Sequence, residues 1–307
     1  IKFLKVESLI FYYCLVRNYY FITDFNPSII ALFAKKVFIQ IHDLSWTNRN
    51  FARHNSFFYK FFLFFIRNYS NIITVSNSSK LSIRNLTGRK KNISYIYNSV
   101  TCDFIKSSNY LARKKNIVNN KFISNSINFD LPNIIYIATL SPRKCHSDLL
   151  DALSKTKKKF NINLVGYPND KKIKELIDIN TNAKGKKILS NINYFQELSQ
   201  NHLCSLLLFS SAYVSTSKYE GFGIPALEAN LYNIPLIMRD IDINRELFPE
   251  ANFFNSNKKL IRILDQIKPL SKSEMKNRRK ILYDINEDNL NGLFNYSNLS
   301  NQLLNLI

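Results

Sequence analysis

Short apolar segments alternate with longer segments of helical spacing along most of the 307 residues. Residues 37–41 and 71–76 are two of the apolar segments, and each lies beside a stretch whose apolar residues recur every three or four positions. This alternation predicts βαβ units, in which parallel strands are covered by helices on both faces. The predicted fold class is therefore α/β.

The alternation falls into two sets separated by a polar segment. Residues 106–128 are rich in Asn, Ser and Lys, which is typical of a linker. The predicted domains are an N-terminal domain at 1–110, a linker at 111–130, a C-terminal domain at 131–285, and a C-terminal helix at 286–307 that packs back toward the N-terminal domain. Strands are predicted at 21–23, 37–41, 71–76, 93–100, 133–140, 162–166, 187–192, 212–217 and 235–238, and helices at 3–20, 29–36, 50–69, from 77 or 78, 147–157, 171–179, 200–209, 224–232, 271–283 and 297–307.

The chain is strongly basic for a globular composition. Hydrophobic residues make up 46% and charged residues 21%, which is ordinary, but the formal net charge is +21 and the pI is near 9.7. Such an excess favours anionic partners, namely nucleic acid, an acidic membrane surface or phosphorylated ligands. The length predicts two domains with sizeable cores.

Cysteine spacing and hydropathy predict a cytoplasmic location. Cys14, Cys102, Cys145 and Cys204 lie far apart without a C-x-x-C pair, which favours reduced thiols over a disulfide framework or a zinc site. No run of 18 apolar residues is present, and residues 1–16 are too interrupted by charge for a signal peptide. The absence of an initiator Met predicts that the sequence begins inside a larger reading frame.

The run E-G-F-G-I-P-A-L-E at residues 220–228 joins a predicted strand to a predicted helix. Gly221 and Gly223 permit positive φ or close approach of a ligand, and Pro225 suits a first helical turn. The start of that helix attracts an anion such as a diphosphate. Glu220 and Glu228 can accept hydrogen bonds from hydroxyls on either side of the anion. The alternative is an ordinary strand-to-helix turn with two surface glutamates.

The longer stretch SKYEGFGIPALEANLYNIPLI resembles the E-x7-E signature of retaining family 4 glycosyltransferases. The resemblance implies the GT-B fold, in which two Rossmann-like domains with parallel sheets face a cleft. It also implies a nucleotide diphosphate sugar as donor. Relative to the family, the opening strand and Gly-rich loop are missing, so the N-terminal domain is predicted to be shortened on its acceptor side. The predicted donor-binding residues are Glu228, Gly221, Phe222, Gly223 and Ile224.

A basic pair follows the first predicted strand of the second set. Arg143 offers a planar donor fork and Lys144 a compact cation, and both suit a leaving diphosphate. The alternative is a solvated surface pair. The segment TLSPRK resembles the TLEPRK-type loop of family 4 enzymes, whose basic residues contact the donor phosphates. The following residue is usually Gly or Asn in that loop, whereas Cys145 stands here.

His42 ends a predicted strand of the first set. It is interpreted either as a hydrogen-bond donor to a sugar hydroxyl or as a core histidine that is hydrogen-bonded to a neighbour. The segment IHDLS around it is similar to one in family 4 members, and the resemblance implies that His42 reaches the donor sugar across the cleft. Glu246 matches a family glutamate near the donor loop, or it is a helix-surface carboxylate.

The predicted helix at residues 50–69 mixes aromatic residues with Arg53, Lys60 and Arg67. It reads either as a core helix of the first domain or as a segment that lies on an anionic bilayer. The interpretation favours a core helix with one exposed basic side that touches lipid headgroups.

Together these patterns predict a retaining glycosyltransferase that moves a hexose from a GDP- or UDP-linked donor to a saccharide or polyprenyl-diphosphate-linked acceptor. Polysaccharide or lipopolysaccharide synthesis is the expected setting, in the cytoplasm or peripherally on the inner membrane. No metal or other cofactor is expected. A catalytically impaired relative that binds nucleotide or a partner protein is the alternative; nucleic acid is disfavoured because no binding motif for it is found. The predicted catalytic residues are His42, Glu220, Arg143 and Lys144.

Overall fold

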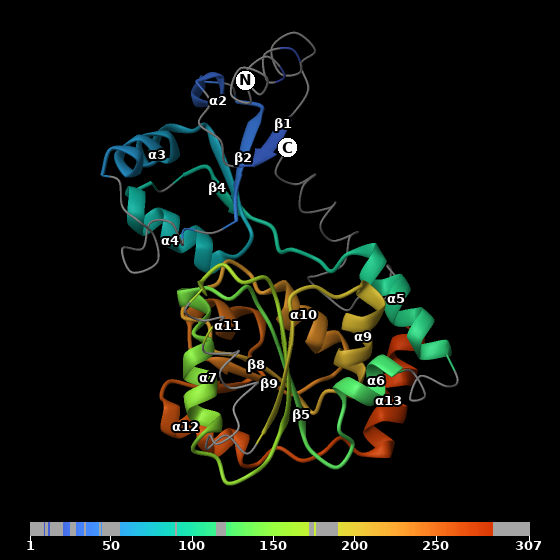
Figure 1. The fold of residues 1–307 in the computed structure, drawn as a ribbon. Helices are drawn as coiled ribbons and strands as arrows, with labels where there is room; N and C mark the ends of the chain where they lie inside the picture. The colour runs from blue at the N-terminus through green and yellow to red at the C-terminus, as the bar shows by residue number, and fades with distance from the viewer. Residues whose placement is uncertain are drawn as a thin grey trace. The chain divides into compact units, whose positions relative to one another are not determined.

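The protein forms two compact α/β units. The computed structural model describes residues 9, 12, 21–24, 29–33, 35–42, 44, 56–89, 91–114, 121–171, 175 and 190–284 (Figure 1). By their contacts, residues 1–98, 220–222 and 292–307 belong to unit 1, and residues 99–219 and 223–291 belong to unit 2.

Unit 1 contains a four-stranded parallel sheet in the order β1-β2-β3-β4. Its inner strand β2 consists of β-branched and aromatic residues apart from Gln40 and is almost wholly buried, as expected for a strand covered on both faces. Helix α4 begins after Ser76, whose side chain accepts from the Ser79 amide, and ends at Gly88 with φ +73°. The elements are β1 (Phe21–Asp24), α2 (Ile30–Phe33), β2 (Val37–Ile41), α3 (Ser56–Asn68), β3 (Asn71–Thr74), α4 (Asn77–Thr87) and β4 (Ile93–Tyr95).

Unit 2 contains a six-stranded parallel sheet in the order β10-β9-β8-β5-β6-β7. Counted from β5, this is the strand order 3-2-1-4-5-6 of a doubly wound Rossmann sheet. The order reverses between β5 and β8, which pair directly with each other. The strands are β5 (Asn133–Ile137), β6 (Asn161–Val165), β7 (Asn191–Phe195), β8 (Ala212–Ser215), β9 (Leu236–Arg239) and β10 (Asn252–Phe254).

Helices cover both faces of this sheet (Figure 1). On one face α7 packs against α12, and on the other α5 packs against α9 and α13. The core on the α7 side is made of aliphatic and aromatic residues from the strands and from these two helices. The helices are α5 (Cys102–Arg113), α6 (Lys121–Ser126), α7 (His146–Leu153), α9 (Gln200–Phe209), α10 (Ile224–Leu231), α11 (Asp242–Leu247), α12 (Asn257–Leu264) and α13 (Lys272–Asp284), and residues Pro142–Lys144 form a 3-10 turn, η4.

The α/β class with parallel sheets is confirmed, and most predicted strands and helices are found within a few residues of their expected bounds. Several details differ. The cap of α4 is Ser76 and not residue 77 or 78, and β7 begins at Asn191, later than the strand predicted at 187–192. The elements α11, β10 and α12 were not predicted, although Ser256 is a recognisable cap for α12.

The predicted linker is largely helical. Helices α5 and α6 occupy much of residues 102–126, because Phe104, Ile105 and Leu111 recur at helical spacing and are buried within unit 2. Contacts place the boundary between the units at residue 99 instead of near 110. Most of each helix predicted at 3–20 and 171–179 lies outside the described residues. The helix predicted at 297–307 and the C-terminal helix 286–307, with its return toward the N-terminal domain, lie entirely outside them.

Within the described ranges, no helix is both long enough and apolar enough to cross a membrane.

Candidate functional site

The site lies at the point where the strand order of unit 2 reverses. Strands β5 and β8 are neighbours there, and the loop after each begins at the carboxyl edge of the sheet. In open α/β sheets, ligands bind outside the carboxyl ends of the strands at such a reversal. The loop after β5 carries Arg143 and Lys144, and the loop after β8 leads through Glu220 to helix α10. The two loops singled out in the sequence therefore follow adjacent strands.

The loop after β5 turns tightly before it enters α7. Pro142–Lys144 form the 3-10 turn η4, in which the Lys144 amide donates to the Ser141 carbonyl at 3.0 Å. Cys145 then takes a left-handed conformation with φ +50° and ψ +46°. Only Gly, and less often Asn or Asp, adopts this conformation readily. This explains physically why Gly or Asn suits the position that Cys145 occupies.

Hydrogen bonds join the loop after β5 to the segment after β8. The Arg143 guanidinium donates to the Tyr219 carbonyl at 3.1 Å, and the Lys218 amide donates to the Arg143 carbonyl at 2.9 Å. The Thr216 hydroxyl contacts the carbonyls of Lys144 and Cys145 at 2.9 and 2.8 Å. The basic pair is thus fixed beside the segment that leads to Glu220.

A buried layer supports this loop from the sheet side. The Tyr136 hydroxyl donates to the Lys144 carbonyl at 2.6 Å, and the ring of His146 stacks on Tyr136 with centroids 4.6 Å apart. Burial lowers the pKa of His146 to about 4, with a smaller effect from the charge of Lys144, so the imidazole is neutral at pH 7. The layer contains no exposed group that could contact a ligand.

Arg239, at the end of β9, ties this support together. Its guanidinium donates to the Thr216 carbonyl at 2.8 Å and to the Asp148 carboxylate at 2.5 Å. Tyr136, Thr216, Arg239 and Asp148 were all missed in the sequence, because none of them belongs to a short motif. The sequence marks only Thr216, because a polar residue at that position follows the apolar strand β8.

The loop after β8 begins helix α10 with two expected features. Gly223 has φ +94°, which few other residues tolerate, and Pro225 stands in the first turn. The amides of Ala226 and Leu227 already donate to the Gly223 carbonyl. Pro225 has no N–H and therefore cannot donate to an anion. The start of α10 offers an anion its dipole and the amides of Gly223 and Ile224, which is fewer donors than a helix start without proline provides.

Glu228 lies one turn into α10 and is partly buried. Burial raises the pKa of its carboxyl from 4.5 to about 7. Within the described part of the chain, its side chain makes no hydrogen bond. Titratable groups with such shifts, when they border a ligand edge, are typical of functional sites. The arrangement provides a hydrogen-bond acceptor whose charge a bound ligand would stabilise.

The remaining predicted residues are placed as follows. Glu220 is half-buried, and contacts assign it to unit 1 together with Gly221 and the buried Phe222. His42 directly follows β2 in unit 1 and has an exposed side chain. Within unit 2, the structure brings the loop that carries Arg143 and Lys144 to residues 216–219 after β8. The role predicted for His42 across a cleft stays a prediction.

Comparison with known proteins identifies a family for this chain. The profile of the family described as Glycosyl transferases group 1 matches residues 118–285, more than half of the chain. The serotype-specific mannosyltransferase WbdA of Escherichia coli is 29% identical over 132 residues. That match covers 41% of this chain but only 15% of WbdA.

Solved structures share the fold at low sequence identity. Sucrose-phosphate synthase from Thermosynechococcus elongatus superposes with a TM-score of 0.67 and 16% identity, covering 99% of this chain and 77% of that one. Anabaena Alr3699/HepE, solved in complex with UDP-glucose, gives a TM-score of 0.62 and 16% identity, covering 88% of this chain and 71% of that one. With the family profile spanning most of unit 2 and its two loops, the chain belongs to the group 1 glycosyltransferase family.

Proposed function

We propose that the protein is a retaining glycosyltransferase of family 4 that transfers a hexose from a GDP- or UDP-linked donor to a saccharide or lipid-linked saccharide. The observation that carries the proposal is the pairing of two loops at the strand-order reversal. The Arg143-Lys144 loop is hydrogen-bonded to the segment that leads into α10, and α10 carries the partly buried Glu228. This pairing supports a site in which cationic donors and a carboxylate acceptor act on the same donor molecule.

Each residue has a role that follows from its chemistry. Arg143, Lys144 and the start of α10 stabilise the diphosphate as the bond from the anomeric carbon to its oxygen breaks, because negative charge accumulates there. Glu228 accepts hydrogen bonds from the ribose hydroxyls, and Glu220 accepts one from the transferred sugar. The acceptor oxygen attacks the face that the diphosphate leaves, and the departing phosphate takes its proton.

Two further elements of the proposal concern His42 and the absence of a metal requirement. We assign His42 of unit 1 to the donor sugar, where its imidazole donates to a hydroxyl. We also propose that no metal is needed, because the two basic side chains supply the positive charge that a divalent cation would otherwise bring to the diphosphate.

Similar proteins support the substrate class. WbdA is named a mannosyltransferase, and Alr3699/HepE was solved with UDP-glucose. A hexose donated from a nucleotide agrees with both names. Because this chain spans a small part of WbdA, its activity, donor and acceptor remain proposals, as does polysaccharide or lipopolysaccharide synthesis.

A panel of UDP-, GDP- and dTDP-hexoses tests the function. The purified chain is incubated with each donor, with and without polyprenyl-diphosphate-linked saccharides, and nucleotide release and product anomer are measured by NMR. The proposal predicts release from at least one donor and a product with the donor's anomeric configuration. An inverted product contradicts the retaining mechanism. Binding without release in any combination favours the alternative, a nucleotide-binding relative without turnover.

Helix α3 supports peripheral contact with an anionic membrane at the cytoplasmic face. Phe65 and Ile66 are buried, whereas Phe61 and Phe64 are 40% and 55% exposed beside the exposed Lys60 and Arg67. Exposed rings and cations on one helix suit anionic headgroups, each cation adding about 1 kcal/mol near such a surface. We expect co-sedimentation with anionic vesicles at low salt that weakens in Phe64→Ala. Failure of the wild-type protein to pellet contradicts the membrane assignment.

A further inference from the structure

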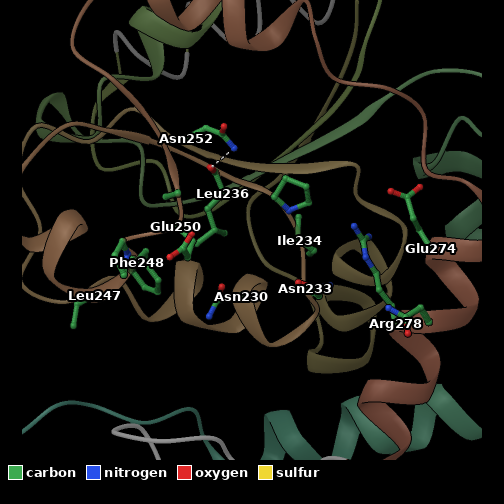
Figure 2. A pocket seen from close by; sticks show the side chains of 14 residues that line it. Asn230, Asn233, Ile234, Leu236, Leu247, Phe248, Glu250, Asn252, Glu274 and Arg278 are labelled. Atoms are coloured by element: carbon green, nitrogen blue, oxygen red, sulfur yellow. Dashed lines mark hydrogen bonds between the residues drawn. The ribbon is translucent and has the colours of Figure 1, made fainter.

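A hollow of unit 2 lies at the edge of the sheet opposite the proposed donor site. Its volume is about 460 Å3, within the range of about 300–1,000 Å3 found for small-molecule sites. It is lined by residues that precede β9 and β10, by the end of α10 and by α13 (Figure 2). Because the strands are parallel, these positions lie at the amino ends of the strands, away from Arg143 and Lys144.

The floor and the rim of this amino-edge pocket differ in chemistry. The floor is apolar, since Ile234, Leu236, Leu247 and Phe248 line the pocket and are each buried. The rim is polar and exposed, with side chains from opposite sides of the opening (Figure 2). The rim residues are Asn230, Asn233, Glu250, Asn252, Glu274 and Asn277.

Several rim side chains have unused hydrogen-bonding capacity. Asn230, Asn233, Glu250 and Asn277 make no side-chain hydrogen bond to any described residue. Each amide can both donate and accept, and the carboxylate accepts. The rim therefore offers both hydrogen-bond donors and hydrogen-bond acceptors, which suits a ligand that carries both kinds of group.

The charges around the pocket disfavour an anionic ligand. Glu250 and Glu274 are on the rim, and α10 points the negative end of its dipole toward it. The single cation among the lining residues, Arg278, is buried and donates to the carbonyls of Leu208 and Ser210 at 3.3 and 2.5 Å. A nucleotide or a phosphate group would meet carboxylates without a cation directed at it.

We infer that the amino-edge pocket binds a neutral saccharide. Sugar hydroxyls donate and accept, matching the asparagine amides and Glu250, and the C–H face of a pyranose fits the apolar floor. The choice of a saccharide among uncharged ligands rests on the proposed function, whose acceptor and product are saccharides. The pocket would hold a part of the glycan that is remote from the reacting end.

The test uses the full chain and measures saccharide binding in the absence of nucleotide. Mannose, glucose and α-linked mannobiose are titrated while binding is followed by saturation-transfer NMR and calorimetry. Saturable binding of at least one sugar is expected, about tenfold weaker in Asn230→Ala and in Glu250→Gln, because each variant loses one ligand hydrogen bond. Asn230→Trp, which fills the opening from an exposed position, abolishes it. Asn255→Ala, an exposed asparagine at the opposite end of β10, is the matched control and binds as the wild type does.

Three results would overturn the inference. The first is the absence of saturable binding of any of these sugars to the wild-type protein. The second is displacement of the sugar by GDP or UDP, and the third is binding that the rim variants leave unchanged, since either places the sugar elsewhere. Donor binding measured on the same samples separates the two proposals: absence of donor binding to the wild-type protein counts against the proposed function, and absence of sugar binding to the wild-type protein counts against the pocket.

Discussion

The hydroxyl of Tyr136 donates a 2.6 Å hydrogen bond to the carbonyl of Lys144. Tyr136 belongs to β5 and is completely buried, so a core residue of the sheet fixes the backbone of the basic loop. The same carbonyl also accepts from Thr216 after β8. Hydrogen bonds from β5 and from the residue after β8 therefore both hold the loop. They fix the backbone from which the side chains of Arg143 and Lys144 extend.

Removing this hydroxyl should loosen the loop and leave the core intact. Tyr136→Phe keeps the ring and its stacking on His146 but deletes the donor. We expect a loss of about 1 kcal/mol in the free energy of unfolding, measured by urea titration. Donor affinity should fall severalfold by calorimetry. Tyr283→Phe, at an exposed position on α13, is the control and should leave both unchanged. Equal donor affinity in Tyr136→Phe would refute the positioning role.

The left-handed conformation of Cys145 makes a prediction about side-chain shape. A β-branched residue is strongly disfavoured at φ +50°, whereas glycine accepts it. Cys145→Val should therefore lose about 1–3 kcal/mol of unfolding free energy relative to Cys145→Gly. Urea unfolding of the two variants side by side provides the measurement. The conformation assigned here is wrong if Val proves as stable as Gly.

Alanine substitutions at two glycines with positive φ distinguish the stability cost of steric crowding from that of backbone strain. A Cβ on Gly166 would lie 2.1 Å from the Ala138 carbonyl oxygen, whereas a Cβ on Gly88 would meet nothing within 4 Å. Gly88→Ala should cost only the left-handed backbone energy, about 1 kcal/mol. Gly166→Ala should cost clearly more, because the turn after β6 must separate from the loop after β5. Thermal unfolding monitored by circular dichroism tests the order, and a reversed order contradicts the packing of these turns.

The buried carboxyl of Glu228 should make stability depend on pH. Its pKa is raised to about 7 in the native state, so between about pH 4.5 and 7 the native state holds a proton that the unfolded chain has released. The free energy of unfolding contributed by this group therefore falls as pH rises through that window and is constant above it. Glu228→Gln lacks this dependence and should be more stable at pH 8 by on the order of 1–3 kcal/mol.

The difference in unfolding free energy between wild type and Glu228→Gln isolates the contribution of Glu228, because other groups such as His146 titrate in both proteins and cancel. Urea unfolding at pH 5, 6, 7 and 8 should show a stability gap that widens with pH and then levels off. A gap that stays constant over this range would mean that the carboxyl titrates normally.

The sequence was most informative where local pattern and burial agree. Val37–Ile41 and Gln200–Phe209 were predicted with the bounds that the structure shows, because continuous apolar character or a Ser cap marks them. The motifs also singled out two loops that follow the adjacent strands β5 and β8. Polar composition misled at residues 106–128, where a few apolar residues at helical spacing suffice to bury α5.

The support of the site could not be read from the sequence. Tyr136, Thr216 and Arg239 lie up to 103 positions apart in the chain, and they meet only because β5, β8 and β9 are neighbours in one sheet. Their hydrogen bonds depend on strand order, which short-range patterns do not specify. The buried state of Glu228 likewise depends on tertiary packing around α10.

The central claim is that the carboxyl edge of unit 2 binds a nucleotide-linked sugar through Glu228 and the Arg143-Lys144 loop. Calorimetric titration of GDP- and UDP-hexoses into wild type, Glu228→Ala and Glu250→Ala tests it directly, since Glu250 lines the amino-edge pocket and Glu228 does not. The account predicts that one donor binds the wild type and Glu250→Ala with equal affinity and Glu228→Ala at least tenfold more weakly. Equal donor affinity in all three proteins would contradict it.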